Sequence, residues 1–191
     1  MTDAQPSGQL FLVRHTPVKV PAGTCYGRTD LPLDDAKFDQ MVPEIHAQLP
    51  IHAVLLCSPL SRCLHLANAL LARASGRSVV VEPSLVERDF GTWEGRRWDD
   101  IPRAEIDAWA ADFTNYAPPD GESVIAMAER SRVALLNRRQ AGIPMIVVSH
   151  AGPLAAISAR LDGTVLSANT RSQTQGTVVE LSPLWLRLLP R

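Results

Sequence analysis

The chain has 191 residues, of which 46% are hydrophobic and 20% charged, and its formal net charge is −1. This length and composition predict one folded domain, residues 1–191, with a sizeable core. A charge so close to zero excludes the basic field that captures nucleic acid. No apolar stretch approaches the roughly 18 residues that span a bilayer, and the first nine residues lack the basic and apolar regions of a secretion signal.

Cysteine usage bears on location and on metal binding. Cys25, Cys57 and Cys63 are an odd number with no repeated spacing. This suits a reducing cytoplasm better than a disulfide framework. Without a CxxC pair or another dense ligand cluster, we expect no structural zinc site. The oligomeric state is left open, a homodimer included.

The first predicted strand, residues 9–13, is a continuous apolar run that delivers Arg14 and His15. A run of this kind, rich in Val and Leu, indicates a strand covered on both faces. The Pro- and Gly-rich loop that follows, residues 17–32, is too long for a plain connector and is a candidate functional loop. A helix is predicted at 35–48.

The second predicted strand, residues 52–57, is followed by Ser58 and Pro59. Serine before proline predicts an N-cap and a first helical turn. The helix that they open carries Arg62 in its first turn, and its apolar residues recur at the spacing of one buried face. A short strand is predicted at 78–82.

Residues 83–121 are less regular and hold three of the four tryptophans. An insertion of this kind between regular elements commonly forms a cap over a site. A helix at 122–139 then leads to a strand at 143–149, which delivers His150. The chain turns at Ala151 into a helix that ends near residue 162.

Two closing strands, residues 177–181 and 184–188, look like an antiparallel pair. The alternation of strands and helices favours an α/β fold over an all-β or all-helical one. The sequence therefore predicts a three-layer α/β/α sandwich around a mixed, mostly parallel central sheet.

Polar side chains are expected to converge at one rim of this sheet, where α/β folds place their ligands. They are Arg14 with His15, Arg62, Glu87 and His150. Guanidinium groups suit bidentate phosphate contacts, and a neutral imidazole such as His15 can attack phosphorus. A second imidazole, His150, can donate a hydrogen bond to the transferring oxygens. The set indicates phosphate chemistry.

A leaving alkoxide needs a proton, which a carboxylic acid held partly protonated in a secluded site can supply. Glu87 is the candidate for this role, and Glu94 is the alternative. The helices that begin near Pro59 and Pro153 are expected to direct N–H groups toward the same place, as anion sites.

Four segments, in this order, resemble the motifs of the histidine phosphatase superfamily, the phosphoglycerate-mutase-like phosphatases. They read Leu12-Val13-Arg14-His15-Thr16, Ser58-Pro59-Leu60-Ser61-Arg62, Leu85-Val86-Glu87-Arg88-Asp89-Phe90-Gly91-Thr92-Trp93-Glu94-Gly95 and Val148-Ser149-His150-Ala151-Gly152. The resemblance covers the chain from about residue 9 to 190, and it implies the phosphoglycerate-mutase-like fold.

The resemblance also implies a role for each matching residue. His15 would be the phosphorylated nucleophile, Glu87 the proton donor, and Arg14, Arg62 and His150 the rest of the phosphate pocket. No metal and no cofactor are implied. The expected function is therefore hydrolysis of a small-molecule phosphate monoester. A phosphomutase with the same intermediate is the alternative, and a catalytically silent phospho-ligand-binding protein is the third hypothesis.

Within the family, residues 23–33 look most like the α-ribazole phosphatase branch. By position, Tyr26 and Gly27 are expected to bind substrate, together with Ala151. The sequence departs from the family at Thr16, where glycine is usual. If the backbone must approach phosphate closely at this position, a β-carbon there can alter the substrate geometry.

Overall fold

The computed structural model describes residues 8–75, 77–138, 140, 142–162, 166–167 and 173–181. Its centre is a five-stranded sheet of order β3-β2-β4-β1-β5. The strands are β1 (Leu10–Arg14), β2 (Ala53–Cys57), β3 (Arg77–Val81), β4 (Met145–Ser149) and β5 (Val178–Leu181). Strands β1 to β4 pair in parallel, and β5 runs antiparallel to β1. The predicted mixed, mostly parallel sheet is confirmed, while the predicted strand at 184–188 lies outside the described residues.

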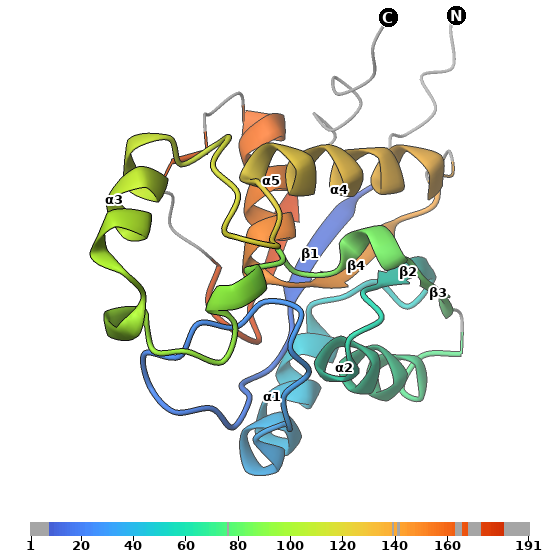
Figure 1. The fold of residues 1–191 in the computed structure, drawn as a ribbon. Coiled ribbons are helices and arrows are strands. Elements are labelled where there is room, and N and C mark those ends of the chain that lie inside the picture. The colour runs from blue at the N-terminus through green and yellow to red at the C-terminus, as the bar shows by residue number, and fades with distance from the viewer. Residues whose placement is uncertain are drawn as a thin grey trace, which may run out of the picture.

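Helices cover both faces of the sheet, which confirms the α/β class (Figure 1). They are α1 (Asp35–Ala47) and α2 (Ser61–Leu71) on one face, and α4 (Val124–Arg138) and α5 (Ala151–Asp162) on the other. Strand β1 shows why its sequence is continuously apolar. Phe11 and Val13 pack into the core beneath α1 and α2, whereas Leu10 and Leu12 pack beneath α4 and α5. A strand buried on both faces has no polar side.

The start of α2 differs from the prediction. The chain stays extended through Leu60, the N-cap residue, whose side chain caps nothing, and the helix begins at Ser61. Instead, the Asp30 carboxylate accepts hydrogen bonds from the Ser61 amide at 3.1 and 3.2 Å. The predicted N-cap role of Ser58 is therefore wrong, because the helix begins three residues after it, although its hydroxyl accepts from the Leu60 amide at 3.4 Å.

The segment from 83 to 121 contains more regular structure than its sequence suggests. It holds three short 3₁₀ helices and α3 (Arg103–Ala111), which stands apart from the sheet (Figure 1). No residue of α3 is fully buried. Its Trp109 ring stacks on Trp98 with 5.7 Å between centroids, and both rings pack against the buried Trp93. The tryptophans therefore form a small aromatic core of their own.

The register of β1, β2 and β4 brings the three polar residues that follow them, His15, Ser58 and His150, to one edge of the sheet. Arg14 pairs with Ser149, and Cys57 pairs with Val148. One residue further on, the His15 amide donates to the Ser149 carbonyl at 3.1 Å, and the Ser58 amide donates to Val148 at 3.0 Å. The residues that follow β1, β2 and β4 therefore meet at the carboxyl-terminal edge.

Candidate active site

His15 follows β1 directly and is only 1% exposed. Its Nδ1 lies 2.7 Å from the Thr16 carbonyl oxygen. Because a carbonyl can only accept, Nδ1 carries the proton and Nε2 has the free lone pair. Burial, reinforced by the positive charges of Arg62 and Arg14, lowers the pKa of His15 to about 3. The ring is therefore neutral near pH 7, which is the form that can attack an electrophile.

His150 lies beside His15, with 5.2 Å between the ring centroids. Arg62 Nε donates to its Nδ1 at 3.2 Å, so the ring proton is on Nε2, which is 2.7 Å from the Ser58 hydroxyl. Burial lowers the pKa of His150 well below its usual value, so this ring is also neutral. Both ring nitrogens are thus held by protein groups. The sequence reasoning missed the role of Ser58, although its place directly after β2 was a usable signal.

The two predicted guanidiniums reach the same edge. Arg62 is fully buried and donates to the carbonyls of Gly27 at 2.6 Å and Thr29 at 2.8 Å. Arg14 donates to the Gln173 carbonyl at 2.6 Å, while its buried Nε has no partner among the described residues. Burial lowers the pKa of Arg14, and the nearby Glu87 opposes that shift. A buried charged donor without an acceptor suits an anionic ligand.

The structure separates the two carboxylate candidates. Burial raises the pKa of Glu87, although its carboxylate accepts from the amides of Arg88 at 2.9 Å and Gly152 at 3.1 Å. For Glu94, burial also favours the neutral form. Hydrogen bonds from the Thr29 side chain and from backbone amides outweigh burial, however, and lower the pKa of Glu94. Glu87 is therefore the carboxyl group suited to hold a proton.

The anion sites predicted at two helix starts are already engaged by protein carboxylates. Asp30 accepts from the first amide of α2, and Glu87 accepts from the Gly152 amide in the first turn of α5. The α5 terminus thus positions Glu87 in the structure. The expectation that these helix ends present free N–H groups to a ligand is not met.

The residues predicted to bind substrate surround the same region. The Tyr26 ring lies 5.7 Å from the Arg62 guanidinium, and its hydroxyl is 3.4 Å from Gln175 Nε2. Gly27 has no room for a side chain, since a β-carbon would lie 1.9 Å from the Arg88 carbonyl oxygen. Ala151 lines a cavity beside Glu87. Gln175, which the sequence reasoning did not single out, thus adds to the wall formed by Tyr26.

This cavity has a volume of about 320 Å³ and includes Glu87 in its lining. Phe90, Trp109 and Phe113 supply aromatic walls. Arg88 also lines it, but donates to the backbone carbonyls of Glu122 at 2.8 Å and Tyr116 at 3.0 Å. The cavity therefore joins a buried carboxyl group to a mostly apolar, aromatic space.

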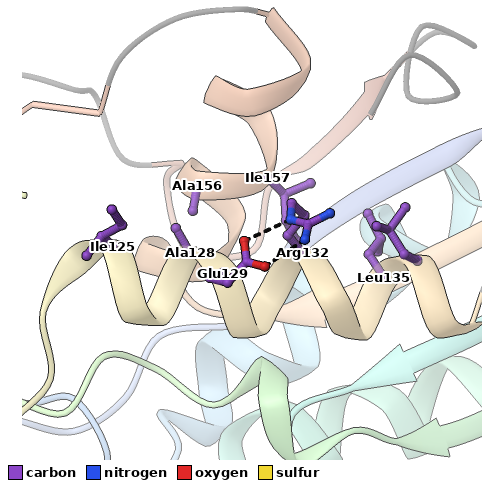
Figure 2. Close-up of a pocket in the computed structure, with 8 residues that line it drawn as sticks. Ile125, Ala128, Glu129, Arg132, Leu135, Ala156 and Ile157 are labelled. Atoms are coloured by element: carbon purple, nitrogen blue, oxygen red, sulfur yellow. Dashed lines mark hydrogen bonds and ion pairs between the residues drawn. The ribbon is translucent and has the colours of Figure 1, made fainter. Parts of the chain in front are cut away.

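A second hollow, of about 340 Å³, lies between α4 and α5 on the far side of these helices from the sheet (Figure 2). An ion pair between Glu129 and Arg132, both on α4, is 2.6 Å long and forms part of its lining. In the described part of the chain its lining contains none of the predicted site residues, whereas the first cavity is lined by Glu87 and Ala151. It is therefore not the candidate active site.

Metal-binding clusters and membrane-spanning helices are both absent from the described residues. No group of three or more His, Cys, Asp or Glu side chains is arranged to hold a metal ion there. Within the same residues, no helix is both long enough and apolar enough to cross a membrane.

The fold and the site define an α/β phosphatase with a histidine at its centre. The sequence profile of the histidine phosphatase superfamily (branch 1) matches residues 10–183, and the chain belongs to this superfamily. Because curated relatives over most of its length are phosphatases, the chain is a phosphoric monoester hydrolase.

Two curated relatives illustrate the similarity. The adenosylcobalamin/alpha-ribazole phosphatase of Escherichia coli is 32% identical over 167 residues, which cover 81% of this chain and 79% of that protein. The glucosyl-3-phosphoglycerate phosphatase of Mycolicibacterium vanbaalenii is also 32% identical, over 168 residues that cover 81% of this chain and 74% of that protein.

Solved structures of the same two kinds of phosphatase are similar in fold. A putative alpha-ribazole-5'-P phosphatase from Escherichia coli has a TM-score of 0.78 at 27% identity, covering 91% of this chain and 89% of that one. A mycobacterial glucosyl-3-phosphoglycerate phosphatase has a TM-score of 0.74 at 26% identity, with the same coverage. The predicted family and fold are confirmed.

Proposed function

We propose that this chain is a metal-independent phosphomonoesterase that acts through a phosphohistidine at His15. The observation that carries the proposal is the state of His15: buried, neutral, and protonated at Nδ1 so that Nε2 is free. The positive charges of Arg14 and Arg62 help to lower the pKa of His15, and we expect the same charges to stabilise a phosphoryl group on that ring. A cytoplasmic location belongs to the proposal, supported by three cysteines that are free thiols.

The reaction has two steps. In the first, His15 Nε2 forms a bond to phosphorus, the ester P–O bond breaks, and Glu87 gives its proton to the leaving alkoxide. In the second, water attacks phosphorus, the N–P bond breaks, and the Glu87 carboxylate takes the proton from that water. Inorganic phosphate leaves and both side chains return to their starting states. Arg14 and Arg62 stabilise the charge on the transferring oxygens in both steps.

The test of the proposal is His15→Ala. We expect this variant to remain folded and to lose turnover, and the wild type to form an acid-labile, alkali-stable phosphoenzyme that the variant does not form. A variant that retains more than a few per cent of wild-type activity would remove the nucleophile assignment. Transfer of the phosphoryl group to a second hydroxyl, in place of phosphate release, would identify a mutase.

For the substrate, we propose α-ribazole 5′-phosphate or a similar ester with a flat, uncharged leaving group. The aromatic walls of the cavity beside Glu87 support this choice. An acid phosphate needs a cation for its carboxylate, but the nearby cations have partners. Lys19 pairs with Asp35 at 2.7 Å, and Arg28 pairs with Asp89 at 3.1 Å.

A substrate panel tests this choice. We expect kcat/KM for α-ribazole 5′-phosphate to exceed that for 3-phosphoglycerate and for glucosyl-3-phosphoglycerate at least tenfold, about 1.4 kcal/mol in transition-state free energy. Comparable kcat/KM values, or a preference for either acid, would contradict the proposed substrate and leave only the general phosphatase activity.

A further inference from the structure

The Glu94 carboxylate is hydrogen-bonded on both oxygens to the loop that precedes α1. Oε1 accepts from the Arg28 amide at 2.8 Å and from the Phe90 amide at 3.2 Å. Oε2 accepts from the Thr29 amide at 2.6 Å and also from the Thr29 hydroxyl. Three of these four donors belong to Arg28 and Thr29, so they tie the loop at residues 27–29 to the 83–121 segment, while the Phe90 amide holds the carboxylate from within that segment.

The charge on Glu94 is part of this arrangement. Burial alone would raise its pKa, but the donated hydrogen bonds lower it below the usual value. The group is thus an acceptor at all four bonds and holds no proton to give away. Glu94 and Glu87 lie in the same motif, yet their environments suit them to different tasks.

The same loop holds Arg62. The carbonyl oxygens of Gly27 and Thr29 accept from its two terminal nitrogens at 2.6 and 2.8 Å. The Thr29 amide therefore donates to Glu94, and the Thr29 carbonyl accepts from Arg62. At Gly27 the packing is so close that a β-carbon would lie 2.9 Å from Glu94 Oε1. A single short loop thus connects the Glu94 carboxylate to the Arg62 guanidinium.

We propose that Glu94 is a positioning residue, which sets the place of the Arg62 guanidinium through the loop at residues 27–29 and thereby sets the affinity of the site for phosphate. The inference rests on the proposed function in one respect, the contact of Arg62 with the phosphoryl group. It assigns Glu94 no contact with substrate and no proton transfer.

Glu94→Gln tests the proposal. Glutamine keeps one accepting oxygen but turns an NH₂ group toward groups that are themselves donors. Two of the four hydrogen bonds to residue 94 are therefore lost. We expect the dissociation constant of inorganic phosphate to rise about tenfold, the effect of losing one hydrogen bond to a charged group. The loss in kcat/KM should be equal for p-nitrophenyl phosphate and for an alkyl phosphate, because the leaving group is not involved. A larger loss on the alkyl ester would make Glu94 a proton donor and overturn the proposal.

Glu105→Gln is the matched control, since Glu105 lies in the same segment and accepts from the Trp93 indole at 2.5 Å. Glutamine can still accept that bond, and phosphate binding should stay within about twofold of wild type. An equal loss in Glu105→Gln and Glu94→Gln would indicate general loosening of the segment and would contradict a specific role for Glu94.

A double-mutant cycle with Arg62→Lys tests whether Glu94 acts on phosphate affinity through Arg62. If Glu94 acts through the guanidinium, Glu94→Gln should change phosphate affinity by less than about twofold in the Arg62→Lys background. Additive losses would overturn the proposal. If Arg62→Lys alone leaves phosphate binding unchanged, the proposed phosphate pocket is itself wrong. Should circular dichroism show that Glu94→Gln is unfolded, Thr29→Val takes its place in the same cycle, with the same outcomes decisive.

Discussion

Replacing Glu87 with glutamine separates proton donation from every other contribution of the site. The side chain is nearly isosteric, and its carbonyl oxygen can still accept from the amides of Arg88 and Gly152, which lie 2.9 and 3.1 Å from the carboxylate. What glutamine cannot do is release a proton to a leaving oxygen. The variant therefore removes the acid and leaves the architecture around it in place.

The size of the effect depends on the leaving group. General acid catalysis contributes about 10²- to 10⁴-fold, which corresponds to about 3 to 5 kcal/mol of transition-state free energy. An alkyl phosphate should lose that factor in full, because an alkoxide leaves only with a proton. A nitrophenolate leaves without one, so p-nitrophenyl phosphate should keep its kcat/KM to within about tenfold. The two losses should therefore differ by at least tenfold.

The assay is kcat/KM for both substrates, in wild type and variant, across a pH series. Burial raises the pKa of Glu87. The acid is protonated below this raised pKa and loses its proton as the pH rises through it. Wild-type activity on the alkyl ester should fall on this alkaline side, and that fall should be absent from the Glu87→Gln profile. Equal losses on both esters, or an unchanged alkaline limb, would refute the assignment.

Three further outcomes are expected. Unfolding free energy should fall by about 2 kcal/mol between pH 7 and pH 5 because of His15 alone, since the unfolded chain takes up a proton below its usual pKa of 6.5 and the native ring does not until about 3. Buried His150 adds its own loss, so urea titrations should show a loss in both proteins that is smaller in His15→Asn by about this amount; equal losses would contradict the reasoning. Ser58→Ala leaves the His150 Nε2–H with only the weak acceptor Cys63 Sγ, at 3.5 Å, and should lower kcat/KM at least about fivefold on both esters, from the roughly 1–3 kcal/mol cost of a buried group that loses its partner; full activity would show that the hydroxyl is dispensable. Exhaustive EDTA treatment should leave turnover unchanged, whereas a loss restored by Zn²⁺ or Mg²⁺ would contradict the mechanism.

The fold was predictable where a local pattern carried the information. Strands β1, β2 and β4 are fully or almost fully buried and read as continuous apolar runs. Helix α3 was not predicted, because it lies in a segment rich in turn signals and its Ile106 and Trp109 pack in the aromatic cluster and not against the sheet. Burial on one broad face marks a helix in sequence, and α3 has no such face.

The candidate site was predictable to the level of residue types and strand ends. His15 and His150 were located by the strands that precede them, Arg62 by its place in the first turn after Ser58 and Pro59, and Glu87 by the need for an acid; the family motifs pointed to the same residues. Ser58 was read as a helix cap because serine before proline is a local signal, whereas its partner is 92 residues away. Glu94 was left beside Glu87 as an alternative acid, since sequence alone does not show which carboxylate receives four hydrogen bonds.

The order of strands in the sheet has a consequence for how the protein is made. Leu10 in β1 pairs with Met145 on one side and with Leu181 on the other, so both neighbours of the first strand are synthesised last. Pairings this remote in sequence form late, since a long loop must close first. As the chain emerges from the ribosome, both edges of β1 remain unpaired until β4 and β5 are synthesised. Unpaired strand edges of this kind favour aggregation. The residue proposed to carry the phosphoryl group therefore directly follows the strand that, among those described, stays unpaired longest during synthesis.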